Sequence, residues 1–368
     1  MKKLMILALL SVLGTTFAGA QVSGTAGAWT DYNSNAFSDA SGGGTLTLGA
    51  FLDLAADWPF GNSPLSVSAD YAGSYSAYLS YLGRSHQDHL ADALLVLDIG
   101  KDGYAGLGGS FDVQLNSSDR KYYDNSSTAA ILESKIYLAG PLLLRLEGSL
   151  GKTSFSYFTN YDFNNTNISG SLSLFLPTKT ALIGLADYGR KNYLSDNDTL
   201  APQNIVFFSP RFKFTQAMGQ NVGLALSFGT QQNKVTADSF YLPDTLLREV
   251  AGYFDYRGNR LEAQLTFLTP GDNKVVAYGR YSDMDFSSLY AYTKAGSDTS
   301  SPFSRTKSTV LRKDAITELG VELTLGFGDS GDKTSSLILG GNYLINSSND
   351  PYYDFSRMLF SATFEYGF

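Results

Sequence analysis

The chain has 368 residues, a formal net charge of −8 and no cysteine. The lack of cysteine excludes disulfide frameworks, thiolate metal sites and cysteine nucleophiles, and the acidic balance argues against a nucleic-acid partner. Gly (37), Tyr (24) and Phe (24) are abundant, whereas Pro (10) is not, which is unlike a soluble α/β protein. Beyond the first twenty residues no apolar run reaches 18 residues, so no transmembrane helix is predicted.

The first twenty residues, MKKLMILALLSVLGTTFAGA, contain two lysines, an apolar run and a small-residue end, in that order. This order is typical of a secretory signal peptide, here with cleavage after Ala20. The alternative is a buried N-terminal helix. Residues 21–368 contain no linker composition, so we expect them to form a single domain.

After this segment, apolar residues recur at every second position, which is the period of a β-strand. In GGGTLTLGAFLDLAADW (42–58) the even positions from Leu46 to Trp58 are apolar, and the odd positions include Asp53 and Asp57. PLLLRLEGSLGKT (141–153) and ITELGVELTLGF (316–327) alternate in the same way. One face of each strand is therefore apolar, and the other is polar or small.

The connections between these strands alternate between short turns and long polar stretches. Gly, Pro, Asn and Asp mark seven short turns, at 59–64, 100–103, 139–141, 176–179, 217–221, 269–273 and 328–333. The eight longer stretches lie near 31–43, 80–92, 116–128, 156–166, 191–204, 232–248, 285–313 and 346–354. Fifteen connections predict 16 strands, with 14 or 18 as the alternatives. The fold class is all-β, an antiparallel up-and-down transmembrane barrel with short periplasmic turns and long extracellular loops.

One segment, REVAGYFDYRGNRLEAQLTFL (248–268), contains RGN, which could form an extra hairpin. Ala251, Tyr253, Leu261 and Phe267 keep the same parity on both sides of RGN. We therefore expect one long strand through it.

The chain ends in MLFSATFEYGF, which alternates apolar residues up to a terminal Phe. With the signal peptide and the alternation elsewhere, this ending resembles the bacterial outer-membrane β-barrel superfamily, with no specific subfamily. The resemblance implies an outer-membrane location, contact with membrane lipid, and a C-terminal signal for the barrel-assembly machinery. It also allows a homotrimer, although the sequence identifies no packing face for one. The signal residues would be Phe360, Ala362, Phe364, Tyr366 and Phe368.

Charged residues fall on the polar face of the strands, which we expect to line a hydrated lumen, because Lys or Arg facing lipid costs about 2–4 kcal/mol at the midplane. A single charge of this kind is more often a solvated or paired wall residue than a specific site. The expected lumenal acids are Asp53, Asp57, Asp70, Asp98, Asp112, Glu133, Glu147, Asp187, Glu262, Glu318, Glu322 and Glu365. The expected bases are Lys135, Arg145, Arg211, Lys213, Arg260, Lys274, Arg280 and Arg357.

The longest polar stretch, 285–313, is rich in Lys and Arg, and it either folds into the acidic lumen as a constriction or stays on the surface. The small acidic excess of the wall predicts a weak preference for cations. The candidates for a lumen or constriction role are Arg145, Glu147, Arg211, Lys213, Arg280, Glu318, Glu322, Arg305, Lys307, Arg312 and Lys313.

Other chemistry has little support in the sequence. The HQDH segment places His86 and His89 in an expected external loop, a weak metal signal, and two histidines in the whole chain leave little for a hydrolase. No Gly-rich segment precedes a Lys-Ser/Thr pair and a helix, so no phosphate loop is predicted. We expect no enzyme activity, cofactor or metal.

The leading functional hypothesis is a porin-like channel for passive or weakly selective diffusion of small hydrophilic solutes. The alternative is a surface-exposed adhesion or partner-docking barrel without an open pore, because DRKYYDNSS and SYFTNYDFNN offer Tyr, Asn and Ser for contacts. A plugged transporter of hydrophobic solutes is a third hypothesis, for which no plug segment is recognisable.

Overall fold

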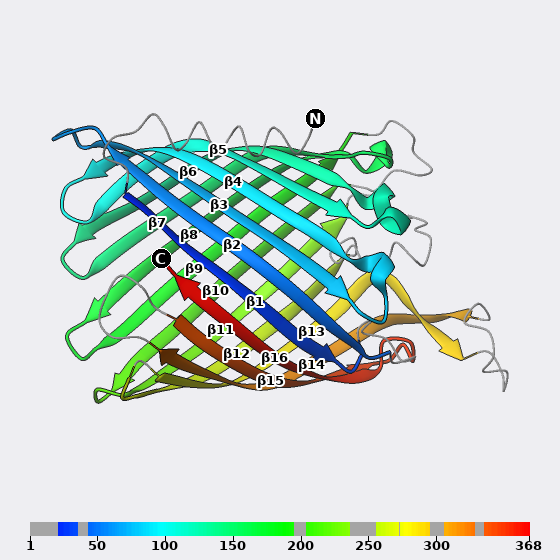
Figure 1. Ribbon diagram of the computed structural model, residues 1–368. Helices are drawn as coiled ribbons and strands as arrows, with labels where there is room; N and C mark the ends of the chain where they lie inside the picture. Colours follow the sequence, from blue (N-terminus) through cyan, green and yellow to red (C-terminus); the bar gives the residue numbers. More distant parts are fainter. Residues whose placement is uncertain are drawn as a thin grey trace.

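The computed structural model describes residues 21–35, 43–194, 204–235, 255–271, 273–294, 305–327 and 335–368. These residues form 16 antiparallel strands that close into a barrel (Figure 1). Three short 3₁₀ turns, η1 (Leu82–Arg84), η2 (Ser118–Tyr123) and η3 (Thr159–Tyr161), lie in the connections. The strands are β1 (Gln21–Asn33), β2 (Thr45–Pro59), β3 (Leu65–Tyr78), β4 (His86–Ile99), β5 (Gly103–Asn116), β6 (Asn125–Ala139), β7 (Leu142–Phe155), β8 (Phe163–Leu176), β9 (Thr180–Tyr193), β10 (Ile205–Met218), β11 (Val222–Val235), β12 (Tyr256–Thr269), β13 (Asn273–Lys294), β14 (Arg305–Phe327), β15 (Ser335–Ser348) and β16 (Phe355–Gly367).

Each strand pairs with its neighbours in the chain, and β1 pairs with β16 to close the ring. The predicted fold class and the count of 16 strands are therefore confirmed for the described residues. The short turns gather at one end of the barrel and the loops with the 3₁₀ turns at the other (Figure 1). Four short turns use glycines with positive φ, Gly61, Gly100, Gly219 and Gly271, a conformation that other residues rarely adopt. Since barrels of this type turn tightly on the periplasmic side, the short-turn end is periplasmic.

Several strands reach further into the expected loops than the sequence suggested. β4 already begins at His86, and β13 and β14 extend to Lys294 and from Arg305, so the loop expected over 285–313 is largely paired strand. The correction has a physical cause: segments such as Leu289–Tyr292 are apolar and aromatic, which favours pairing over open loop. The structure describes Arg257–Asn259 as part of β12, so RGN forms no hairpin.

Some predictions lie outside the described residues. These are the signal peptide at residues 1–20, the turn at 328–333, and Ala251 and Tyr253 in the extension of β12. They stay predictions.

The two faces of the barrel wall differ in chemistry. Large apolar side chains such as Leu48, Leu107 and Phe364 are 44%, 62% and 49% exposed on the outer face. Among the described residues only seven hydrophobic side chains are buried, and they form no continuous core. Within that part of the chain, no helix is long and apolar enough to cross a membrane. A closed sheet satisfies its backbone groups internally, so its apolar outer face can lie in lipid.

Candidate functional site: the lumenal wall

The strand register identifies the lumenal face, because residues paired across neighbouring strands point to the same side of a sheet. Most of the exposed apolar residues share one face, and most of the strand charges share the other. The twelve acids and eight bases that the sequence predicted for the lumenal wall all lie on this second face. The charges remain solvated: the paired side chains of Arg211 and Asp187 are 36% and 28% exposed.

The wall formed by β1 to β5 is purely acidic. These five adjacent strands contain no Lys, Arg or Glu, and every one of their aspartates faces the lumen. Asp70 and Asp92 are register partners on β3 and β4. We call this surface the aspartate wall; its residues are Asp31, Asp53, Asp57, Asp70, Asp88, Asp92, Asp98 and Asp112.

The wall opposite the aspartate wall is basic. In the ring of 16 strands β11 lies halfway round from β3, so β9 to β13 face β1 to β5 across the lumen. On β9 to β13 the lumenal bases are Lys191, Arg211, Lys213, Arg260, Lys274 and Arg280. Unlike the aspartate wall, this side carries its own counter-charges. It therefore contributes a smaller net field than its number of cations suggests.

Ion pairs supply this compensation. Arg211 Nη2 lies 2.6 Å from Asp187 Oδ2. Arg280 lies 3.6 Å from Glu262 and 3.5 Å from Glu318, so one guanidinium bridges three neighbouring strands. Exposed pairs of this kind contribute little to stability, about 0–1 kcal/mol each. Their effect is on the local charge of the lumen.

Sequence reasoning missed four charges of the lumenal face: Asp31, Asp88, Asp92 and Lys191. All four had been assigned to loops or to loop edges. For Asp88 and Asp92 on β4, the sequence signal is the alternation in HQDHLADALLVLDI. Ala91, Ala93, Leu95 and Leu97 face outward there, so the even positions face the lumen.

Between the two walls, β6 and β7 carry stacked pairs of like charge. Glu133 is the register partner of Glu147, and on the next lumenal rung Lys135 is the partner of Arg145. Glu147 also accepts a hydrogen bond from Ser169 Oγ at 3.3 Å. The acidic rung and the basic rung are diagonal neighbours, which offsets the repulsion within each pair.

Bulky lumenal side chains lie flat against the wall over glycines. Trp29 is the register partner of Gly49, and Tyr278 is the partner of Gly320. In both pairs a Cβ on the glycine would collide with the ring. The missing side chain lets the ring lie along the sheet instead of projecting across the lumen.

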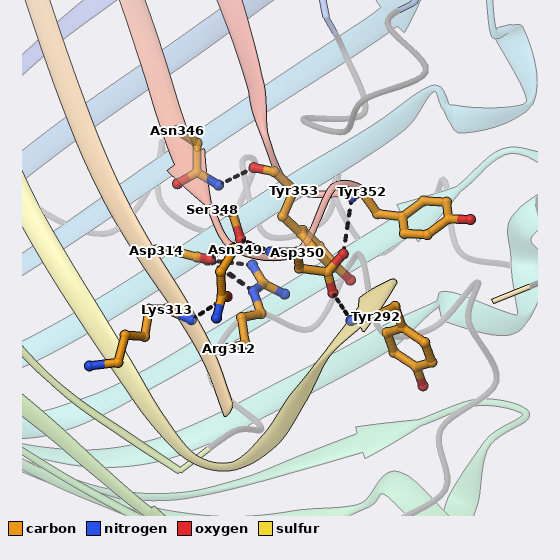
Figure 2. A network of polar contacts seen from close by, with 10 residues as sticks. All are labelled: Tyr292, Arg312, Lys313, Asp314, Asn346, Ser348, Asn349, Asp350, Tyr352 and Tyr353. Atoms are coloured by element: carbon orange, nitrogen blue, oxygen red, sulfur yellow. Dashed lines mark hydrogen bonds and ion pairs between the residues drawn. The ribbon is translucent and has the colours of Figure 1, made fainter. Parts of the chain in front are cut away.

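At the extracellular end, β13 and β14 continue as a hairpin that projects past the ends of the other strands (Figure 1). Its pairing is shifted between Asp285 and Tyr292, which marks a bulge in the hairpin. The base of the hairpin is tied to the β15–β16 loop. Buried Asp350 accepts hydrogen bonds from the backbone N–H groups of Tyr292 at 3.2 Å and Tyr352 at 3.0 Å (Figure 2).

Arg312 is the centre of the same network, which we call the latch: Arg312, Asp314, Asp350 and Tyr353 (Figure 2). The Arg312 and Asp314 side chains are only 9% and 1% exposed and form an ion pair. The guanidinium carbon lies 3.4 Å from the ring centroid of Tyr353. Arg312 therefore serves the packing of the hairpin base and is not an open lumenal charge.

The constriction candidates consequently separate into groups. Arg145, Glu147, Arg211, Lys213, Arg280, Glu318 and Glu322 face the lumen. Lys313 does not: it pairs with Asp285 at 3.0 Å on the outer face, which corrects its assignment to the lumen. Arg305 and Lys307 belong to the hairpin, and their side chains lie outside the described part. A constricting role for the lumen-facing residues, and for Arg305 and Lys307, stays a prediction.

The two histidines are on a strand, not in a loop, and they face opposite sides of it. His86 faces the lumen, where it lies 3.3 Å from Asp88. His89 faces outward, with Nδ1 2.9 Å from the hydroxyl of Tyr71. They cannot share a ligand from one face, and no group of three or more potential metal-ligating side chains converges within the described residues.

The last strand closes the barrel with its apolar face outward. Phe360 is 56% exposed, and the Phe368 ring stacks on Tyr366 with centroids 6.3 Å apart. Phe368 also exchanges two backbone hydrogen bonds of 2.9 Å with Gly24. A Cβ on Gly24 would lie 2.7 Å from the Phe368 ring, so the glycine makes room for the terminal aromatic residue.

A closed barrel with a hydrated, charged interior, an apolar exterior and short turns at one end is the architecture of barrels that span bacterial outer membranes. The chain is a β-barrel of the outer-membrane type. This architecture agrees with the predicted resemblance to outer-membrane β-barrels and with the predicted location of the barrel in the outer membrane. No family model matches the chain, and no curated protein matches it either.

Solved structures resemble the barrel in fold. A bacterial polysaccharide outer membrane secretin is 9% identical, with a TM-score of 0.51 over 94% of this chain and 97% of that one. The outer membrane protein opdK from Pseudomonas aeruginosa is 10% identical, with a TM-score of 0.49 over 95% and 99%. OpdL from the same organism is 14% identical, with a TM-score of 0.45 over 95% and 98%. So few identical residues make this a likeness of fold alone.

Proposed function

We propose that the barrel is a channel for passive, weakly selective diffusion of small hydrophilic solutes across the outer membrane. The observation that carries this proposal is the hydrated charged interior: lumenal charges such as Lys274 and Glu322 are 41% and 43% exposed, where a packed core would exclude water. Barrels of 16 strands are wide enough for an aqueous channel. The channel needs no cofactor, and we propose no enzymatic step.

The charge distribution supports a preference for cations. The aspartate wall has no Lys or Arg on its own strands, whereas several bases on the opposite wall are held in ion pairs. Unpaired carboxylates attract cations into a narrow aqueous space and repel anions. Small neutral and cationic solutes should therefore pass more readily than anions of the same size.

The glycine pairs described above support the width of the lumen. Trp29 and Tyr278 would otherwise project inward from the wall. Because each ring lies against a glycine, the two largest lumenal side chains of their strands occupy little of the cross-section.

Liposome swelling tests this proposal directly. Vesicles that contain the full barrel should swell in isotonic solutions of a monosaccharide and of lysine, and more slowly in glutamate. A large polysaccharide should cause no swelling. Folded barrel in the vesicles with no swelling in any small solute would refute the channel.

A docking role is the second candidate, and the projecting β13–β14 hairpin is the observation that favours it (Figure 1). A hairpin that is fixed at its base by the latch presents a stable surface beyond the membrane. Shortening the hairpin should leave swelling unchanged in either case, but it would abolish binding of a surface partner only if the barrel docks one.

A further inference from the structure

Among the described strands, the outward-facing bases gather mainly in one sector, apart from Lys313 on β14. On β7 to β12 every acid faces the lumen, whereas four bases face outward. All four side chains are exposed. We call them the basic outer surface: Lys152, Arg190, Lys234 and Arg257.

These bases share one level of the barrel. Lys152 and Arg190 lie three residues before the extracellular ends of β7 and β9. Lys234 is one residue from the end of β11, and Arg257 is the second residue of β12. Toward the membrane the next outward residue below Arg190 is Tyr188, which is 37% exposed. The bases therefore lie just above the apolar band, at the height of the outer-leaflet headgroups.

They are also close to one another around the barrel. Arg190 pairs with Val206, and Val206 pairs with Lys234, so these two bases share a rung across β9, β10 and β11. Two strand spacings separate them, about 10 Å. Arg257 pairs with Gln232, the outward neighbour of Lys234. Such a spacing suits several phosphate groups on one or two headgroups.

No acid on the described strands β7 to β11 faces outward beside Lys152, Arg190 and Lys234, whereas Arg257 is the register partner of Asp285 on β13. Arg190 Nε donates a hydrogen bond to Asn192 Oδ1 at 2.7 Å, a neutral partner that orients the guanidinium. Asp285 also forms an ion pair of 3.0 Å with Lys313, an outward base on β14. The first three bases therefore differ from Arg257 and Lys313, which both have this acid beside them. The opposite sector, β1 to β5, has no Lys or Arg at all.

We propose that the basic outer surface binds the phosphate groups of outer-leaflet lipid headgroups. Arg and Lys are the side chains that recognise phosphate, and here they stand directly above an apolar surface that takes the acyl chains. One lipid molecule would thus place its phosphate groups against the bases and its acyl chains against the apolar surface below them. The barrel would gather phosphorylated lipid on β7 to β12 and leave β1 to β5 to neutral lipid. This inference does not depend on whether the lumen conducts.

The test is a binding titration with the full folded barrel in neutral detergent micelles. The probe is a bisphosphorylated diglucosamine lipid, and its dephosphorylated form is the reference. We expect the wild type to prefer the phosphorylated lipid, and the variant K152Q/R190Q/K234Q/R257Q to bind it at least about tenfold more weakly. The matched control K101Q/R120Q/K121Q/K179Q removes four bases from turns and loops, three of them exposed and Arg120 half-buried, and should change binding less than about twofold.

Three results would overturn the proposal. The first is equal binding of both lipids by the wild type, and the second is an unchanged affinity in the quadruple variant. The third is full competition by millimolar inorganic phosphate, which would make phosphate itself the ligand. If the quadruple variant fails to fold, K152Q/R190Q and K234Q/R257Q are measured separately, and each should lose part of the preference.

Discussion

Asp70 on β3 and Asp92 on β4 are register partners, and both carboxylates face the lumen. Like charges directly opposite in a sheet are destabilising. No Lys or Arg on β1 to β5 offsets the pair. A sheet built for stability alone would not place them together, so the pair is best understood as a feature of the channel interior.

Replacing both residues, D70N/D92N, should reduce the preference for cations. The change removes two negative charges from the aspartate wall and keeps the size of the side chains. The reversal potential under a salt gradient should move toward zero, while unfolding becomes no easier. The control D102N/D119N removes two exposed charges outside the lumen, from a periplasmic turn and an extracellular loop, and should leave the reversal potential unchanged. A shift of equal size in the control would contradict the role of the wall.

The latch predicts a large effect of D314N. This change leaves the buried Arg312 guanidinium without its carboxylate, and breaking a buried pair in this way costs about 3–5 kcal/mol. We expect protease cleavage of the β13–β14 hairpin at concentrations that spare the wild type, measured by limited proteolysis of barrel in vesicles. The double variant R312M/D314L removes both charges and should be cleaved more slowly than D314N. Equal cleavage of both variants would mean that the ion pair has no special role.

The pair of Trp29 and Gly49 predicts a change of pore size. In G49A the new methyl group takes the place of the Trp29 ring, which must turn into the lumen. Single-channel conductance should fall, and W29A/G49A should restore it. The alternative outcome, a fall that W29A does not rescue, would assign the effect to the backbone of β2.

The terminal aromatic residue predicts an effect on assembly in cells. Phe368 packs over Gly24 at the closing seam, and by resemblance it belongs to the signal for the barrel-assembly machinery. Deleting Phe368 should lower the amount of folded barrel in the outer membrane, while refolding of purified chain in detergent continues. The control F60A changes an exposed Phe in a periplasmic turn and should have no effect on either measurement. Equal loss in both assays would indicate a seam defect instead of a lost signal.

Much of the fold was predictable because the strand period is encoded locally. The alternation in 316–327 identifies β14, and the Gly and Pro residues of 59–64 identify the turn before β3. The ends of strands were less predictable. Polar residues such as Asp88 continue a strand above the membrane as readily as they form a loop, and only pairing with Gln114 on β5 decides between the two.

Only part of the charge asymmetry of the lumen could be predicted from the sequence. The inward position of each charge follows from its parity, but the opposition of two walls depends on closure of the ring. Lys313 shows the limit most plainly. It is adjacent in the chain to Arg312, and reasoning from charge alone named both as candidates for the lumen, whereas the register places Lys313 outside against Asp285.

Single-channel recording of the wild-type barrel in a planar bilayer under a salt gradient tests the central claim most directly. We predict stable conductance steps, with a reversal potential on the cation-selective side because the aspartate wall has no cations on its own strands. Folded barrel that inserts without conductance steps would contradict the channel. Steps with anion selectivity would contradict the role given to the aspartate wall.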